Sequence, residues 1–228
     1  MSLILNIETA TTNCSVSLAK DGELLVLREN NTPNYSHAEQ LHVFIEECMK
    51  EAKCGMSDLD AVAVSKGPGS YTGLRIGVSS VKGLCFALNI PLIATDTLKC
   101  LAMQKASEQY DFIVPCLDAR RMEVYAEVFD KKLAVVRDTK AEIIDEQYLS
   151  DYYLQGITYV IGSGADKIAA LIHHPNLISY PKNVPSAVEM VYASYEKFIQ
   201  KDFEDLAYFE PYYLKDFIVQ KPKNKVSK

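Results

Sequence analysis

Residues 3–27, LILNIETATTNCSVSLAKDGELLVL, decide the fold class of this chain. The run Leu3–Ile7 is apolar, and residues 14–18 alternate between small polar and apolar side chains, as a half-buried strand does. The dipeptide Asp21-Gly22 tolerates the positive φ angles of a type I′ turn, so we expect residues 24–27 to return as a strand. The chain is therefore predicted to open with three linked strands.

Helical patterns then alternate with short apolar runs. Ser36 and Glu39 have the spacing of a capping box, and the apolar face that follows predicts a helix ending near Lys53. The glycine-rich segment 67–73 is typical of a loop that opens a second helix. The other elements predicted for this half are strands at residues 61–64 and 91–94 and a third helix from about Thr97.

The same order of elements returns in the second half. The predicted elements there are strands at residues 112–117, 123–129, 133–136 and 157–161 and helices at 145–154 and 186–199. Strands followed by crossover helices, repeated in this way, favour two related α/β lobes with mixed sheets. We therefore divide the chain into a first lobe at 1–106, a second lobe at 107–215 and a tail at 216–228.

Composition bounds the class of protein. The chain has 228 residues, 48% of them hydrophobic and 24% charged, which predicts a folded protein with a real core. The net charge of −6 disfavours a stand-alone nucleic-acid binder, because phosphate contacts need a positive surface. The lysine-rich end of the tail is interpreted as a solvated terminus without a function.

Cysteine usage and hydropathy indicate a compartment. The six cysteines contain no CxxC pair, which argues against a zinc knuckle or a disulfide framework and predicts buried, reduced thiols. No apolar run approaches the roughly 20 residues of a membrane helix, and the start lacks the pattern of a signal peptide. We expect a cytoplasmic protein that makes no membrane contact.

Three motifs resemble those of the TsaB (YeaZ) family of tRNA threonylcarbamoyladenosine biosynthesis in their order and spacing. They are residues 67–77 (GPGSYTGLRIG), 36–39 (SHAE) and 118–121 (DARR). The resemblance covers nearly the whole chain and includes Tyr213-Leu214-Lys215, although the family more often has Arg where Lys215 stands. Glu8, at the end of the first strand, also departs from the Asp that is usual in the family.

The resemblance implies a duplicated, actin-like or ribonuclease H-like (ASKHA) fold of two lobes with helix-flanked mixed sheets. It also implies a place in the bacterial assembly that modifies adenosine 37 of tRNAs reading codons beginning with A. In that assembly TsaB pairs with its catalytic paralogue TsaD, the ATPase TsaE joins the pair, and TsaB alone forms homodimers. Contact with tRNA is then expected to be indirect, through the complex.

The resemblance further implies that this chain has lost the chemistry of TsaD. TsaD holds an iron or zinc ion on two histidines four residues apart, and Thr97 and Leu101 stand at the matching positions here. Residues 118–121 occupy a turn that usually needs small side chains, so that backbone amides can approach a phosphate. Arg120 and Arg121 would obstruct that approach. We therefore predict no catalytic residue, no metal site and no cofactor, as in a pseudo-enzyme.

The predicted working surface is helical. Gly73, Gly77 and Ser80 would give the second helix a small-residue face for a neighbouring helix. The neighbour could be the helix at residues 36–53 of this chain, but the family builds its shared interface from these two helices, so we favour a partner. Val43 and Leu84 are then the candidate outward apolar contacts.

Four charged residues complete the candidate site. Glu8, Arg75, Arg120 and Arg121 are candidates for contacts to a partner or an anion, because a guanidinium grips a phosphate or carboxylate through its planar fork. For Arg120 and Arg121, a structural ion pair is an equally weighted interpretation.

Two other functions remain open at this point. A small ATP-dependent phosphotransferase would use Glu8 beside Mg²⁺, as the threonine-rich segment 9–12 after the first strand suggests. A metallopeptidase is suggested by older associations of these paralogues with glycoproteases, but the histidine pair it would need is missing.

Overall fold

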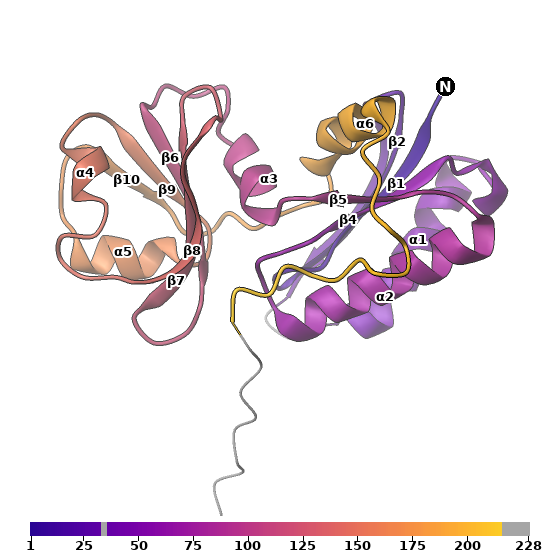
Figure 1. The fold of residues 1–228 in the computed structure, drawn as a ribbon, viewed down its shortest axis with the longest axis horizontal. Coiled ribbons are helices and arrows are strands. Elements are labelled where there is room, and N and C mark those ends of the chain that lie inside the picture. Colours follow the sequence, from indigo (N-terminus) through magenta and orange to yellow (C-terminus); the bar gives the residue numbers. More distant parts are fainter. Residues whose placement is uncertain (33–35, 216–228) are drawn as a thin grey trace, which may run out of the picture.

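The computed structural model describes residues 1–32 and 36–215, which form two lobes (Figure 1). The first sheet contains β1 (Leu3–Glu8), β2 (Asn13–Lys20), β3 (Glu23–Asn31), β4 (Ala61–Ser65) and β5 (Leu92–Thr95). The second contains β6 (Phe112–Asp118), β7 (Glu123–Asp130), β8 (Val135–Ile143), β9 (Thr158–Ile161) and β10 (Leu177–Tyr180). The helices are α1 (His37–Glu51), α2 (Tyr71–Leu88), α3 (Thr97–Met103), α4 (Ser150–Tyr153), α5 (Ala165–Leu171) and α6 (Met190–Gln200), with a 3₁₀ turn, η1, at Met56–Asp58. The predicted tail, 216–228, lies outside the described residues.

The two sheets share one topology. The first has the strand order β3-β2-β1-β4-β5, and the second, read from its other edge, has the order β8-β7-β6-β9-β10. In each lobe the first three strands pair antiparallel, and the remaining two join in parallel. This repetition confirms the predicted fold class, a duplicated actin-like α/β fold with mixed sheets.

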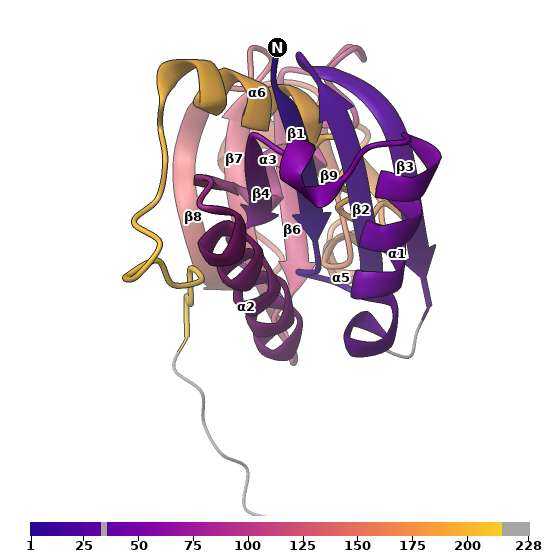
Figure 2. The same ribbon diagram turned by 90° about the vertical axis from the view of Figure 1, so that its right-hand side faces the viewer.

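Helices cover both faces of the first sheet. α1 packs on β2 and β3, while α2 packs mainly on β4. The two helices lie next to each other, as Figure 2 shows. α6 covers the opposite face, against β5, β1, β4 and β3.

Alternation along β1 explains why both faces are apolar. Leu3, Leu5 and Ile7 join the core cluster beneath α1 and α2. Ile4 points to the other side, into the cluster that contains Met190 of α6. Because side chains alternate along a strand, Glu8 belongs to the α6 side as well.

Each sheet is covered partly by a helix from the other half of the chain. α3, which follows the first sheet in sequence, packs on β6 and β7 of the second and lies between the lobes in Figure 1. The helix predicted at 186–199 was placed in the second lobe, but its counterpart α6 packs on the first sheet. The division of the chain at residue 106 stays a prediction. Each of these two helices packs on the sheet that lies on the other side of this division in sequence.

Local differences from the predicted elements have identifiable causes. The type I′ turn is confirmed, with φ of 52° at Asp21 and 82° at Gly22. The capping box is wrong, because Ser36 makes no side-chain hydrogen bond to the helix start. The helix predicted at 145–154 shrinks to α4, since Asp145 accepts from the Gln147 amide in a turn and Leu149 has φ of 66°.

The described chain also contains three elements that the pattern did not predict, η1, α5 and β10, and β8 runs further than expected. Of the helices in the described parts of the chain, none is long and apolar enough to cross a membrane.

Candidate functional site

Two loops meet at the carboxyl ends of β1 and β4. The Ser70 amide donates to the Ala10 carbonyl oxygen at 2.7 Å. A Cβ added to Gly69 would lie 2.4 Å from that same oxygen, so only glycine permits this approach. The glycine-rich segment is therefore used for close contact between two loops of this chain.

The same contact continues into the first turns of α2. A Cβ on Gly73 would lie 2.1 Å from the Thr9 carbonyl oxygen, and one on Gly77 would lie 2.3 Å from Thr9 Oγ1. Thr9 Oγ1 also donates to the Gly73 carbonyl oxygen at 2.8 Å. Gly73 and Gly77, predicted as partner contacts, are thus buried against this chain's own β1–β2 loop. Their small size accommodates Thr9 first of all, and a contact of Gly73 or Gly77 with a partner stays a prediction.

Glu8 ends β1 and has no exposed surface. Its Oε1 accepts from the Ala10 amide at 2.5 Å and from Ser65 Oγ at 2.8 Å. Burial raises the pKa of its carboxyl to about 7, despite these two hydrogen bonds. In this arrangement the Glu8 carboxyl does not reach the surface, where a partner or an anion would meet it.

The outward face of α2 carries a different set of small residues. Ser79, Gly83 and Ala87 are exposed and lie four residues apart, opposite the buried stripe that contains Val81 and Cys85. A Cβ on Gly83 would meet nothing within 4 Å. Sequence reasoning missed this face, although the i, i+4 spacing of small residues opposite the apolar stripe is a signal for it.

Apolar and polar groups flank that face. Phe86 is 80% exposed, and Val43 on α1 is 49% exposed. Ser80 Oγ lies 3.3 Å from His42 Nε2, so Ser80 bridges α2 to α1. Leu84 is half-buried against the core beneath the helices. Of the predicted contacts, Val43 is therefore the one that is largely open.

The C-terminal segment runs along the other side of α2. Lys82 Nζ donates to the carbonyl oxygens of Ala207 and Phe209 at 3.0 and 3.1 Å. The Tyr212 amide donates to the Lys66 carbonyl oxygen at 2.7 Å, and Lys215 forms an ion pair with Glu123 of β7. This segment thus connects α2 to the second lobe.

Arg75 lies next to that segment. Its guanidinium carbon is 4.3 Å from the centre of the Tyr71 ring, which packs 4.9 Å from the Tyr213 ring. Arg75 and Lys82 also line a small cavity of about 290 Å³ beside Tyr213. The structure thus gives Arg75 a stacking partner within the chain while leaving it exposed.

The β6–β7 turn carries the other two arginines. Arg120 and Arg121 are exposed and have φ of 69° and 51°. Asp118 accepts from the Arg120 amide and from Lys167 Nζ, both at 2.6 Å, and these bonds order the turn. Neither guanidinium forms an ion pair with any described residue. A partner or anion contact therefore remains a proposal for them.

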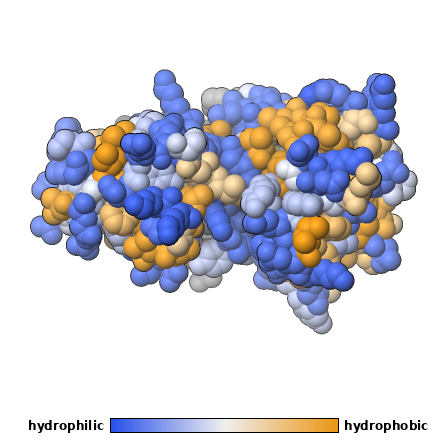
Figure 3. Space-filling model, turned by 90° about the horizontal axis from the view of Figure 1, so that it is seen from above, coloured by the Kyte–Doolittle hydropathy of each residue, from blue (hydrophilic) through white to orange (hydrophobic). Residues whose placement is uncertain are grey.

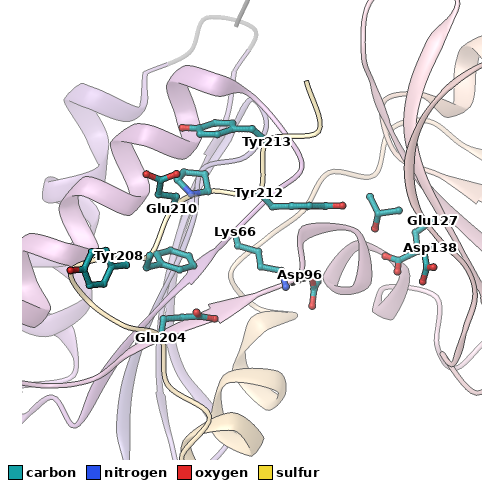
Figure 4. A pocket seen from close by; sticks show the side chains of 12 residues that line it. Lys66, Asp96, Glu127, Asp138, Glu204, Tyr208, Glu210, Tyr212 and Tyr213 are labelled. Carbon is teal, nitrogen blue, oxygen red and sulfur yellow. Dashed lines mark ion pairs between the residues drawn. The ribbon is translucent and has the colours of Figure 1, made fainter. Parts of the chain in front are cut away.

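A cleft of about 990 Å³ opens where the two lobes and the C-terminal segment meet (Figure 4). Its charged lining residues are Lys66, Asp96, Glu127, Asp138, Glu204 and Glu210. Lys66 pairs with Asp96 at 2.8 Å, which leaves the carboxylates in excess. Burial, and then the charges of Asp96 and Asp138, raise the pKa of Glu127 although Thr139 donates to it. A polyphosphate would be repelled by such a lining.

The positions that match the metal ligands of TsaD, and the one buried histidine of the described chain, lie inside the fold. Thr97 and Leu101 are fully buried in α3. Among residues 1–32 and 36–215, no three His, Cys, Asp or Glu side chains are placed to hold a metal ion. His37 is buried, and its Nε2 lies 2.7 Å from the Thr11 carbonyl oxygen, so it fixes the β1–β2 loop to α1.

Comparisons with known proteins place the chain in a family. The family model for TsaD, described as tRNA N6-adenosine threonylcarbamoyltransferase, matches residues 32–226. Two curated relatives are named tRNA threonylcarbamoyladenosine biosynthesis protein TsaB. The one from Haemophilus influenzae is 29% identical over 96% of this chain and 95% of its own length. The one from Escherichia coli is 27% identical over 96% of each chain.

A solved structure agrees with these relatives. YeaZ from Pseudomonas aeruginosa superimposes with a TM-score of 0.82 at 25% identity, over 94% of this chain and 100% of its own. The match extends over both lobes, as does the shared topology of the two sheets. The chain therefore belongs to the TsaD family and, within it, to the TsaB (YeaZ) proteins.

Proposed function

We propose that this chain is a non-catalytic subunit required to form N6-threonylcarbamoyladenosine at position 37 of tRNAs that read codons beginning with A. It acts in the cytoplasm by binding and supporting a TsaD subunit, with TsaE joining the pair. The names of its relatives and the TsaD family model support the pathway. tRNA is reached through the complex.

The observation that carries the proposal is the outward face of α2. Ser79, Gly83 and Ala87 form a row of small, exposed residues along the helix, and a second helix can approach such a row closely. Phe86 offers a large exposed anchor at one side, of the kind that dominates interface energetics. Val43 extends the apolar contact onto α1.

This proposal moves the predicted interface by part of a helical turn. The contact still includes or adjoins Val43, Ser80 and Leu84. Gly73 and Gly77 contribute indirectly, because their packing against Thr9 holds α2 in place. Arg75 is exposed on the side of α2 that meets the C-terminal segment, where it can pair with a partner carboxylate. In the absence of TsaD, the same face pairs with a second copy of this chain.

Three features support the absence of chemistry in this subunit. Glu8 is enclosed and already hydrogen-bonded to Ala10 and Ser65, so it is not available to a substrate. Thr97 and Leu101 lack the nitrogen ligands that an iron or zinc site of the TsaD type needs. The acidic cleft adds a third argument, because it disfavours a bound nucleotide.

The interface is tested by Gly83→Arg, which places a long charged side chain among these small residues at a site where an added Cβ would meet no described atom within 4 Å. We expect binding to the purified TsaD homologue of the same organism, measured by calorimetry, to weaken at least about a hundredfold. The free energy of unfolding should change by less than about 1 kcal/mol. Gln147→Arg, an exposed position on the second lobe, is the matched control and should bind normally.

The role in the pathway is tested by reconstitution. Purified TsaD, TsaE, the enzyme that makes threonylcarbamoyl-adenylate, and tRNA should form modified tRNA when this chain is present and not when it is omitted. The chain alone should transfer nothing. Transfer by the isolated chain, or full binding of TsaD by Gly83→Arg, would contradict the proposal.

A further inference from the structure

The segment that leads from the second lobe into α6 is held on the first sheet by polar side chains of β2. Asn13 Nδ2 donates to the Pro185 carbonyl oxygen at 3.0 Å, and Ser17 Oγ donates to that of Ala187 at 2.8 Å. Between them, Ser15 Oγ accepts from the Ala187 amide at 3.0 Å. The alternating polar residues of β2 thus form a seam with residues 185–187, just before α6.

Two carboxyl groups lie at this seam. Glu8 is fully buried on the α6 side of β1, and its Oε2 has no hydrogen-bond partner among residues 1–32 and 36–215. Glu189 directly precedes α6, and its own Oε2 is likewise buried without a partner in the described chain. The negative charge of Glu189 acts on Glu8. A buried carboxylate with an unpartnered oxygen is costly unless it carries a proton.

Within the described parts of the chain, no positive charge is among the groups that act on Glu8 or Glu189. The titratable groups that act on or around Glu8 are Glu189 before α6, Cys100 on α3 and Cys14 on β2. β4 contributes the neutral Ser65 hydroxyl, which donates to Glu8. Further out, Glu29 of β3 adds another negative charge that acts on Glu189. Among the described residues, the groups that shift the pKa of Glu8 include no Lys, Arg or His.

We propose that Glu8 and Glu189 form a proton-dependent latch: while Glu8 is protonated, residues 181–189 and α6 stay docked on the first sheet, and loss of the proton favours their release. The geometry supports this linkage, because the docked state buries the Oε2 atoms of Glu8 and Glu189 without hydrogen-bond partners in the described chain and release would return both to water. The proton itself moves between the Glu8 carboxyl and solvent, so no other reactant is needed.

The latch also reaches the helix proposed to face the partner. The Glu8 carboxyl accepts from the Ala10 amide, and the carbonyl oxygen of Ala10 accepts from the Ser70 amide at the start of α2. Thr9, between them, packs against Gly73 and Gly77. A change at Glu8 therefore acts on both covering layers of the first sheet, α6 on one side and α2 on the other.

The direction of the pH effect follows from the shift. Burial, with a contribution from Glu189, raises the pKa of Glu8 from its ordinary value of 4.5 to about 7 in the docked state. The stabilising proton is fully bound below about pH 4.5 and is lost as the pH rises through about 7. Over that interval the opening equilibrium constant should increase at least about tenfold per pH unit and level off above, because the pKa of Glu189 is also raised to about 7 and its proton is lost in the same range.

Hydrogen exchange of the full chain tests the latch. At about pH 5.5 and about pH 7.5, amide protection of α6 is compared after correction for the intrinsic exchange rate. We expect the opening constant of α6 to rise about tenfold or more between the two conditions. Glu8→Gln, a neutral mimic of the protonated side chain, should keep α6 better protected and weaken the pH dependence. The part that remains is expected from Glu189, because burial raises the pKa of that carboxyl to about 7 as well.

Three controls keep the result interpretable. Glu146→Gln removes an exposed carboxylate of the second lobe and should retain the wild-type pH dependence. Glu189→Gln should reduce that dependence, because it removes the charge that acts on Glu8. Side-chain ¹³C titration of the unmodified protein should give Glu8 a midpoint near 7 and needs no variant that folds.

The proposal is overturned by any of three results. The first is α6 protection that does not change between the two conditions, and the second is a Glu8→Gln variant that keeps the wild-type pH dependence. The third is a Glu8 carboxyl that titrates near its ordinary value of 4.5. None of these outcomes bears on TsaD binding, so the latch and the proposed function fail separately.

Discussion

Replacing Gly73 by alanine tests whether α2 is held by the loop beneath it. The added Cβ would lie 2.1 Å from the Thr9 carbonyl oxygen, which is backbone and cannot rotate away. Either the loop or the helix must move by about 1 Å to reach an ordinary contact distance. That movement also strains the hydrogen bond from Thr9 Oγ1 to the Gly73 carbonyl oxygen.

The magnitude follows from three opposing contributions. Overpacking costs about 1–3 kcal/mol, and the strained hydrogen bond costs about 1 kcal/mol more. Alanine recovers about 1 kcal/mol through its better helix propensity. We therefore expect Gly73→Ala to lower the free energy of unfolding by about 1–3 kcal/mol.

The same helix provides a matched control. Gly83→Ala makes the identical chemical change at an exposed site where the Cβ meets nothing within 4 Å. It should raise the stability by about 0.5–1 kcal/mol. Urea unfolding followed by circular dichroism measures both variants. A Gly73→Ala variant as stable as Gly83→Ala would refute the packing argument, because opposite signs are its central expectation.

Two further outcomes are expected. Lys82→Met removes the donor that holds Ala207 and Phe209, so chymotrypsin should cleave the C-terminal segment faster than in the wild type or in Lys99→Met, an exposed control on α3; equal rates would speak against this anchor. Native labelling with a thiol reagent should modify Cys54 first, because it is half-exposed while the other five thiols are buried, and rapid labelling of more than one thiol per folded chain would contradict the burial.

Much of the fold could be predicted from local patterns. The Asp21-Gly22 turn needs positive φ at two adjacent residues. Few other dipeptides tolerate that conformation, so the sequence predicts the hairpin. The repeated order of strands and helices predicted two lobes with mixed sheets, which the shared topology confirms. The first signal is local to a dipeptide, and the second is the order of elements along the chain. Neither signal depends on which surfaces pack together when they are far apart in sequence.

Local sequence patterns could not predict which part of the protein an apolar helix face packs against. The periodicity at 186–199 predicts a helix with one buried side, but nothing local says that α6 crosses back to the first sheet. Gly73 and Gly77 likewise indicate that another group packs closely against α2, but the sequence does not show that this group is Thr9. Glu8 could be recognised as a departure from the family, yet its burial depends on α6 and on Glu189, over 180 residues away.

The exchange of α3 and α6 has a consequence for how the chain is made. A ribosome releases β1–β5 long before α6, so one apolar face of the first sheet stays uncovered while the 94 residues from 96 to 189 are synthesised. The nascent first half can protect only the side beneath α1 and α2 during that interval. Folding of the N-terminal half is thus completed only once α6 has been synthesised, and a message cut short before residue 190 would yield a product with an exposed, aggregation-prone sheet.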